Sequence, residues 1–196
     1  MANMSSVNLL IEGNVGIIKG TNPPVNALSY DVRTGLINSI NKLNNNNDVE
    51  VIILVGDGKT FFAGADISEF GKPMKDPDLS SVIAHFEEST KPIVAALHGT
   101  PLGGGLELAM GCHYRVALNN TSMGLPEVKL GIIPGAGGTQ RLPRLVGIEK
   151  SLEMITSGNP INAQKALSYG LISEVYENNL IENAKSFILK KLSINE

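Results

Sequence analysis

Two continuous apolar runs constrain the fold of this chain more than any other feature. Residues 51–55 read Val-Ile-Ile-Leu-Val, and residues 93–97 read Ile-Val-Ala-Ala-Leu behind Pro92. Neither run shows the alternation of polar and apolar residues that marks a strand with one exposed face. Both are instead typical of short strands buried on both faces, as in parallel sheets covered by helices. The rest of the chain must therefore supply helices that cover this sheet.

Amphipathic helices are predicted between and after these strands. Apolar residues recur at three- and four-residue steps in the first helical segment, at Leu28, Val32, Leu36, Ile40 and Leu43. Further helices are predicted over residues 79–86, 106–110, 148–155, 162–169 and 180–192, and short strands over 15–19, 116–118 and 173–176. Residues 125–145 are predicted to be a loop, because Gly and Pro recur there. Alternating strands and helices without a linker indicate one α/β domain over residues 1–196.

The composition argues against several classes of partner. A net charge of −3 over 196 residues gives no basis for binding nucleic acid or an anionic membrane. No run approaches the ~20 apolar residues of a membrane helix, and a signal-peptide pattern is missing. The single Cys112 excludes an internal disulfide, and the three histidines lack metal-ligand spacing. We expect a cytoplasmic protein without a metal, or a peroxisomal or mitochondrial one if the source is a eukaryote.

Residues 56–60, Gly-Asp-Gly-Lys-Thr, follow a predicted strand but do not form a nucleotide-binding motif. A P-loop needs a glycine at position 53, which is Ile53, and a dinucleotide fingerprint starting at Gly56 needs one at position 61, which is Phe61. The sequence also contains no Gly-x-Ser-x-Gly nucleophile motif. These observations argue against a nucleotide-dependent enzyme and against a serine hydrolase of that type.

Three segments contain the residues that catalysis would need. Residues 62–67 (Phe-Ala-Gly-Ala-Asp-Ile) place small residues after a strand, where a ligand can approach backbone N–H groups closely. Residues 102–109 open a helix with three glycines, so that free N–H groups and the positive dipole end can stabilise a developing oxyanion. Residues 124–135 place a glutamate, Glu127, among apolar and turn residues.

Glu107 and Glu127 are the candidate groups for proton transfer. The neighbours of Glu107 are apolar, so partial desolvation should raise the pKa of its carboxyl group, as general acid–base catalysis near neutral pH requires. A surface residue favoured by the helix dipole is the alternative interpretation of Glu107. A solvated loop residue is the alternative for Glu127, and either segment taken alone leaves these alternatives open.

Taken together, the segments resemble the enoyl-CoA hydratase/isomerase (crotonase) family over nearly the whole chain. Five motifs carry the resemblance: residues 22–27, 63–67, 91–96, the glycine triplet with Glu107, and 134–142 (Pro-Gly-Ala-Gly-Gly-Thr-Gln-Arg-Leu). Residues 107–115 are most similar to the amino-terminal part of multifunctional β-oxidation enzymes. In those enzymes a 3-hydroxyacyl-CoA dehydrogenase follows the hydratase/isomerase part in the same chain.

The resemblance implies a spiral of repeated β-β-α units, with the C-terminal helices of the family missing. It implies that the backbone N–H groups of Ala65 and Gly104 hold a thioester oxygen between the two catalytic glutamates. It implies no cofactor, because coenzyme A is part of the substrate, and either a homotrimer or a neighbouring dehydrogenase domain in a longer chain. The residues implied to contact substrate are Pro24, Val25, Asn26, Ala27, Ala63, Ala65, Asp66, Ile67, Gly103, Gly104, Pro126 and Gly135.

The implied reaction is hydration of trans-2-enoyl-CoA to 3-hydroxyacyl-CoA in fatty-acid β-oxidation, together with Δ3-Δ2-enoyl-CoA isomerisation. In this scheme Glu107 is the base toward the attacking water, and Glu127 delivers the proton to C2. The alternatives are an isomerase only, a thioester hydrolase, a decarboxylase, or an inactive CoA-binding domain truncated from a dehydrogenase fusion. Retention of both glutamates favours hydration. Pro101 departs from the small residue usual in the family and stiffens the entry to the glycine triplet.

Overall fold

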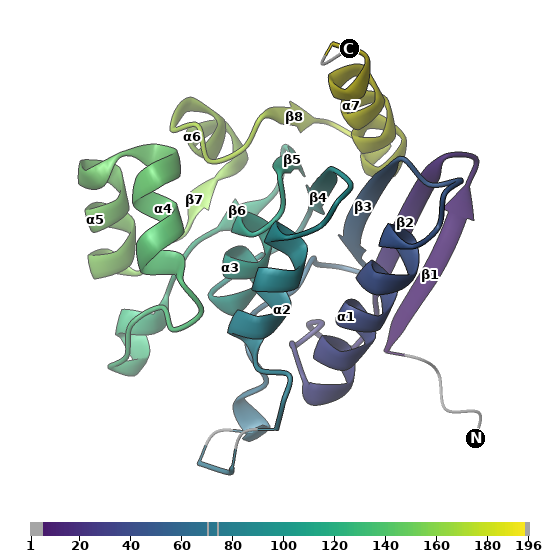
Figure 1. The fold of residues 1–196 in the computed structure, drawn as a ribbon. Coiled ribbons are helices and arrows are strands. Elements are labelled where there is room, and N and C mark those ends of the chain that lie inside the picture. The colour runs from purple at the N-terminus through teal and green to yellow at the C-terminus, as the bar shows by residue number, and fades with distance from the viewer. Residues whose placement is uncertain (1–5, 70, 74, 195–196) are drawn as a thin grey trace.

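A six-stranded sheet organises the chain in the computed structural model, which describes residues 6–69, 71–73 and 75–194 (Figure 1). The strands, in their order across the sheet, are β1 (Val7–Glu12), β2 (Val15–Gly20), β3 (Val51–Gly56), β4 (Ile93–Leu97), β5 (Tyr114–Leu118) and β8 (Glu174–Tyr176). β1 and β2 form an antiparallel hairpin, and the later neighbours pair in parallel. Because β3 and β4 are parallel neighbours, the segments that follow them emerge at the same edge of the sheet.

Helices cover both faces of this sheet. The side chains of β3 alternate between two cores, because successive residues of a strand point to opposite faces. Ile52 and Leu54 pack in one core with α1 (Tyr30–Asn44), α2 (Leu79–Glu87) and α3 (Gly104–Met110). Val51, Ile53 and Val55 pack in the other core with α7 (Leu180–Ile194). All six residues of β3 are buried, as the continuous apolar run predicts.

A second group of elements lies beyond α3, on the side of the sheet away from β1 (Figure 1). It contains α4 (Gly138–Val146), α5 (Ile148–Ser157), α6 (Ala163–Ser168) and a small antiparallel sheet of β6 (Ser122–Met123) and β7 (Ile161–Asn162). Two 3-10 helices, η1 (Ile67–Glu69) and η2 (Glu127–Leu130), lie in the connecting segments. In the part of the chain that the structure describes, no helix combines the length and apolar character of a membrane span.

Most of the predicted elements are confirmed. The strand predicted at 93–97 coincides with β4, and the helix predicted at 106–110 begins two residues earlier, within the glycine triplet. Asn162 caps α6, since its side chain accepts a hydrogen bond from the Lys165 amide at 2.8 Å. Gly170, just after this helix, has a φ of 79°, which favours glycine.

The largest differences between the fold and the prediction concern two segments. The loop predicted over residues 125–145 is wrong, because η2 and most of α4 lie within it. α4 begins directly after Gly137 and contains Pro143. Because both residue types are typical of turns and loops, the sequence pattern predicts a loop where the chain forms a helix. β1 was not predicted, because its residues Leu9, Leu10 and Ile11 break the strict alternation of a half-exposed strand.

Candidate active site

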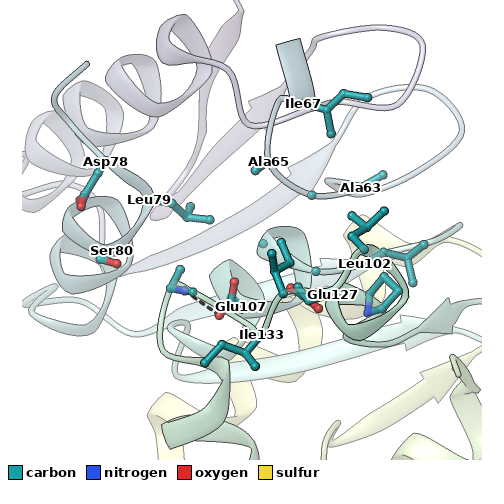
Figure 2. A pocket seen from close by; sticks show the side chains of 18 residues that line it. Ala63, Ala65, Ile67, Asp78, Leu79, Ser80, Leu102, Glu107, Glu127 and Ile133 are labelled. Atoms are coloured by element: carbon teal, nitrogen blue, oxygen red, sulfur yellow. Dashed lines mark hydrogen bonds between the residues drawn. The ribbon is translucent and has the colours of Figure 1, made fainter. Parts of the chain in front are cut away.

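The three segments singled out in the sequence meet around one cavity of about 400 Å³ (Figure 2). The segment after β3, the start of α3, η2 and the loop before α4 form its walls. The residues that line it are Ala63, Gly64, Ala65, Ile67, Asp78, Leu79, Ser80, Leu102, Gly103, Gly104, Glu107, Pro126, Glu127, Leu130, Ile132, Ile133, Gly135 and Ala136. Most of these side chains are apolar or absent, so the two glutamates are its main ionisable groups besides Asp78 at the α2 cap.

Two backbone amides, those of Ala65 and Gly104, lie close together in this wall. A Cβ atom built on Gly104 would lie 3.4 Å from the Ala65 nitrogen. Within the described ranges neither amide donates a hydrogen bond to the protein, whereas the neighbouring amides of Gly103 and Gly105 donate to the carbonyls of Gly124 and Leu102. Ala65 follows Gly64, at a φ of 109°, and Gly104 follows Gly103, at a φ of 52°. The local backbone therefore leaves two N–H donors side by side and unused.

Glu107 lies in the first turn of α3 and is only 3% exposed. Its Oε1 accepts hydrogen bonds from the amides of Ala136 and Gly138, both at 2.8 Å, one of which is drawn in Figure 2. Its Oε2 has no hydrogen-bond partner in the described part of the chain. Burial raises the pKa of this carboxyl group above its ordinary value, and the two amides and the nearby Arg141 offset only part of this shift. The side chain is therefore held by one oxygen, and the other is free to bind water.

Glu127 lies at the start of η2 and is 9% exposed. Its Oε2 is buried and lacks a hydrogen-bond partner among the described residues. Its Oε1 lies beside the glycine triplet, since a Cβ atom on Gly103 would come within 3.1 Å of it. Burial raises the pKa of this carboxyl group, its own backbone amide partly opposes that shift, and the nearby negative charge of Glu107 adds to it. An unpartnered buried oxygen favours the protonated form, so this group is suited to act as an acid.

The remaining predicted contact residues divide into two groups. Ala63, Ile67, Gly103, Pro126 and Gly135 line the cavity together with the amides and the glutamates. Asp66 lines a neighbouring cavity, with Arg33 and Lys72, and Pro24, Val25, Asn26 and Ala27 line neither of the two.

The segment containing residues 24–27 nevertheless runs beside the cavity wall. The Ala63 amide donates to the carbonyl of Val25 at 3.2 Å, and the Leu28 amide donates to that of Gly64 at 2.9 Å. The Asn26 side chain is buried and donates to the carbonyls of Asp57 and Thr60 at 2.7 and 2.8 Å. Asn26 therefore holds the loop that carries the wall, and direct contact of residues 24–27 with substrate remains a prediction.

Sequence reasoning missed two sets of residues at this site. The first comprises apolar side chains of the wall, Leu79, Leu130, Ile132 and Ile133; the last of these is 71% exposed. The adjacent isoleucines before Pro134 are visible in the sequence, but only the structure shows that they are exposed at a cavity. The second set comprises the amides of Ala136 and Gly138, which hold Glu107. Among the described residues, no group of three or more His, Cys, Asp or Glu side chains gathers to hold a metal ion.

Comparisons with known proteins show which family this chain is similar to. The profile of the enoyl-CoA hydratase/isomerase family matches residues 11–194. The peroxisomal bifunctional enzyme of Danio rerio is 46% identical over 181 residues, which are 92% of this chain and 25% of that protein. The probable enoyl-CoA hydratase of Bacillus subtilis (strain 168) is 44% identical over 197 residues, covering 95% of this chain and 76% of that protein. The chain thus spans about a quarter of the first relative.

The fold is shared with solved structures as well. The enoyl-CoA hydratase from Bacillus anthracis superposes with a TM-score of 0.88 and is 36% identical, over 94% of this chain and 76% of that one. The predicted α/β fold of the crotonase type is therefore confirmed. Since the family profile and relatives of high identity both extend over more than nine-tenths of the sequence, the chain belongs to the enoyl-CoA hydratase/isomerase family.

Proposed function

We propose that this chain hydrates trans-2-enoyl-CoA thioesters to 3-hydroxyacyl-CoA, the reaction that fatty-acid β-oxidation requires. Membership of the enoyl-CoA hydratase/isomerase family supports the reaction class. The observation that carries the proposal is the convergence of two unused amides and two buried carboxyl groups on one cavity. Each of these four groups has a role in adding water across a double bond conjugated to a thioester.

The amides of Ala65 and Gly104 polarise the substrate. A thioester oxygen placed between them accepts two hydrogen bonds, which strengthen as negative charge builds on that oxygen. Removing one such donor typically costs ~10²–10³ in rate. Withdrawal of electron density makes C3 of the enoyl group electrophilic toward water. Apolar walls around the amides keep competing water away and so increase the strength of these hydrogen bonds.

The surroundings of the two glutamates assign them different tasks. Two amide donors on Oε1 of Glu107 stabilise the ionised form, so its free Oε2 is suited to take a proton from the attacking water. Glu127 has an unpartnered buried oxygen and the negative charge of Glu107 nearby, so its protonated form is favoured. Glu127 then delivers its proton to C2 of the enolate. Burial raises the pKa of both carboxyl groups, but the amides of Ala136 and Gly138 oppose this effect at Glu107. Environments that separate the pKa values of two carboxyl groups are the usual basis for an acid and base pair.

Isomerisation of Δ3-enoyl-CoA is a second activity that the same site supports. It needs a thioester held by the two amides and one carboxyl group that, in its ionised form, takes a proton from C2 and then delivers it to C4. Glu127, whose Oε1 lies beside the glycine triplet, is placed for that role. Presence of Glu107 in the same cavity favours hydration over isomerisation alone, because isomerisation needs no attacking water.

The coenzyme A part of the substrate would lie along residues 24–27 and 63–67, with contacts mainly to the backbone. We further propose that the chain works beside a dehydrogenase domain or as a homotrimer, as the family resemblance implies. A match to about a quarter of the peroxisomal bifunctional enzyme of Danio rerio is compatible with the first arrangement. Placement in the cytoplasm, or in peroxisomes or mitochondria of a eukaryote, stays a prediction.

Hydration of crotonyl-CoA tests the proposal, since loss of the conjugated double bond lowers the ultraviolet absorbance of the thioester. Glu107→Gln and Glu127→Gln should each reduce kcat by ~10²–10⁴, the usual contribution of general acid–base catalysis. Glu153→Gln, at an exposed glutamate of α5, is the matched control and should retain the wild-type rate. A wild-type chain without hydratase activity, or a Glu107→Gln variant with full activity, would contradict the proposal.

A further inference from the structure

Arg141 is the side chain outside the cavity that is most directly connected to the site. It lies on α4, and its guanidinium group forms a bidentate ion pair with Glu87 on α2, with Nε to Oε1 at 2.6 Å and Nη2 to Oε2 at 2.7 Å. Its third donor, Nη1, reaches the carbonyl of Ala136 at 2.8 Å. Neither Arg141 nor Glu87 lines the cavity, so neither can touch the reacting atoms.

The Ala136 contact connects Arg141 to the carboxyl group of Glu107. The carbonyl of Ala136 accepts from Arg141, and its amide donates to Oε1 of Glu107 at 2.8 Å. The amide of Gly138, two residues on, donates to the same oxygen at 2.8 Å. Residues 136–138 are thus held by the arginine on one side and hold the glutamate on the other. This gives a continuous path Glu87, Arg141, loop backbone, Glu107.

The conformation of Gly137 allows the side chain of Arg141 to approach the backbone of loop 136–138 closely. Its φ of 92° lies in the region that favours glycine, and a Cβ atom there would lie 2.1 Å from Nη1 of Arg141. The guanidinium therefore packs directly over the Gly137 backbone. Ile132, Ile133 and Gly135 of the preceding loop are exposed, whereas Pro134 and Ala136 are buried. Arg141 adds a polar anchor, at the carbonyl of Ala136, for the segment whose amides orient Glu107.

The ion pair between Arg141 and Glu87 contributes little to the stability of the fold. The Arg141 and Glu87 side chains are 21% and 44% exposed, and pairs this accessible typically contribute ~0–1 kcal/mol. What the bidentate geometry does provide is a fixed orientation of the guanidinium plane. That orientation directs Nη1 at one carbonyl of the loop.

We infer that Arg141, oriented by Glu87, is a positioning residue that fixes loop 136–138 so that both of its amides hold Oε1 of Glu107 and leave Oε2 to the attacking water. The inference rests on the proposed hydration. It extends the site to two residues, on α2 and α4, that do not contact the substrate. Loss of this anchor should impair the chemical step while leaving the walls that bind the thioester unchanged.

The test compares Arg141→Met, Arg141→Lys and Glu87→Gln with Arg144→Met, an exposed arginine one turn away on the same helix. In crotonyl-CoA hydration Arg141→Met should lower kcat by about tenfold or more, a part of the full general-base contribution, with KM changed less than twofold. Arg141→Lys and Glu87→Gln should show smaller losses, and Arg144→Met none. Unchanged kcat in Arg141→Met, or a rise in KM alone, would overturn the inference.

The pH profile gives a readout that a purely structural role would not move. Arg141 and the two amides all favour the ionised form of Glu107, so their loss should raise the pKa of that carboxyl group. A general base is inactive when it is protonated, so as the pH falls a base with a higher pKa is lost at a higher pH. The acidic limb of the kcat profile should therefore shift to higher pH in Arg141→Met and, to a lesser extent, in Glu87→Gln. An unshifted limb in Glu87→Gln, with a fall in kcat, would leave only a structural role and would contradict the inference.

Amide hydrogen exchange separates failure of this inference from failure of the proposed function, because it needs no substrate. The amides of Ala136 and Gly138 should exchange about tenfold faster or more in Arg141→Met than in wild type, as local opening becomes easier. The same amides in Arg144→Met should keep the wild-type rate. Equal exchange in both variants would refute the anchoring role even in a chain that has no hydratase activity.

Discussion

The glycine triplet at residues 103–105 sets how closely the start of α3 can approach the segment after β3. A Cβ atom on Gly105 would lie 1.8 Å from the carbonyl oxygen of Phe62, which is a backbone atom and cannot rotate away. On Gly104 it would meet Leu79 Cδ2 at 2.7 Å, the far end of a flexible side chain. Gly105 is therefore the position that most strictly requires glycine, and it keeps the amides of Ala65 and Gly104 adjacent.

Gly105→Ala should destabilise the chain and slow hydration. Replacing glycine by alanine within a helix gains about 1 kcal/mol, but overpacking against a rigid neighbour costs about 1–3 kcal/mol and moves the backbone. We expect the clash to dominate, which lowers the free energy of unfolding and separates the two amides, so that kcat falls. Urea denaturation and crotonyl-CoA hydration measure the two effects. Gly135→Ala, whose methyl group would meet no atom within 4 Å, is the control for stability; equal stability of both variants would contradict this account.

The protonation of Glu127 should make stability depend on pH. Burial and the charge of Glu107 raise its pKa in the folded chain above the ordinary value of 4.5. The folded state therefore binds this proton more tightly than the unfolded state, and the resulting stability is present below pH 4.5 and lost as the pH rises through the raised pKa. The amide side chain of the Glu127→Gln variant does not titrate. The free energy of unfolding of wild type relative to that variant should consequently fall as the pH increases over this range.

Urea denaturation of the two proteins at a series of pH values checks this prediction. Glu107 is present in both, so its own titration largely cancels in the difference. A difference that stays constant with pH, or that grows in favour of the wild type, would show that Glu127 is not destabilised as a carboxylate in the folded chain.

Among the helices, α7 has a purely structural role. It covers the face of the sheet opposite to α1, α2 and α3, and the ring of Phe187 packs edge-on against Tyr114 of β5 at a centroid distance of 5.5 Å. Phe187 is 6% exposed and lies across the sheet from the active-site cavity. Its contacts should therefore affect the stability of the fold and leave the chemistry unchanged.

Phe187→Ala should lower the free energy of unfolding by about 3–5 kcal/mol, the usual cost of removing a buried phenylalanine. The kcat of the folded fraction should change less than about twofold, because Phe187 packs in the core on the far side of the sheet from the site. Ile194→Ala, at a position 66% exposed on the same helix, should change stability by no more than about 0.5 kcal/mol. A loss of kcat in fully folded Phe187→Ala would show that the two faces of the sheet are coupled.

A helix or strand could be predicted from the sequence where its own residues carry a pattern of apolar positions typical of that element. The β3 and β4 strands are continuous apolar runs, and α1 repeats its apolar residues at helical spacing, so each is predicted from its own residues. The helix α4 lacks such a signal, because it begins at a glycine pair and contains Pro143. The helix also holds Arg141, whose contacts with Glu87 and Ala136 involve residues far away or in a loop. Contacts of this kind cannot be predicted from the residues of one segment alone.

The site as a whole results from the order and direction of the strands in the sheet. Ala65 and Gly104 are 39 positions apart, and they become neighbours because they follow β3 and β4, which are adjacent and parallel. Glu127 joins them from η2, a segment predicted as a loop. The candidate glutamates and glycines were identifiable from their motifs and the family resemblance. The hydrogen bonds that differentiate Glu107 from Glu127 were not, because they depend on how loop 134–138 folds over α3.

A structure of the chain bound to an unreactive acyl-CoA would show whether the two amides and the two glutamates surround the reacting atoms. The thioester oxygen should lie about 3 Å from the amide nitrogens of both Ala65 and Gly104, as in a hydrogen bond. Oε2 of Glu107 and the carboxyl group of Glu127 should both lie beside C2 and C3. A thioester oxygen bound away from these amides, or carboxyl groups turned away from C2 and C3, would contradict the proposed roles of these four groups.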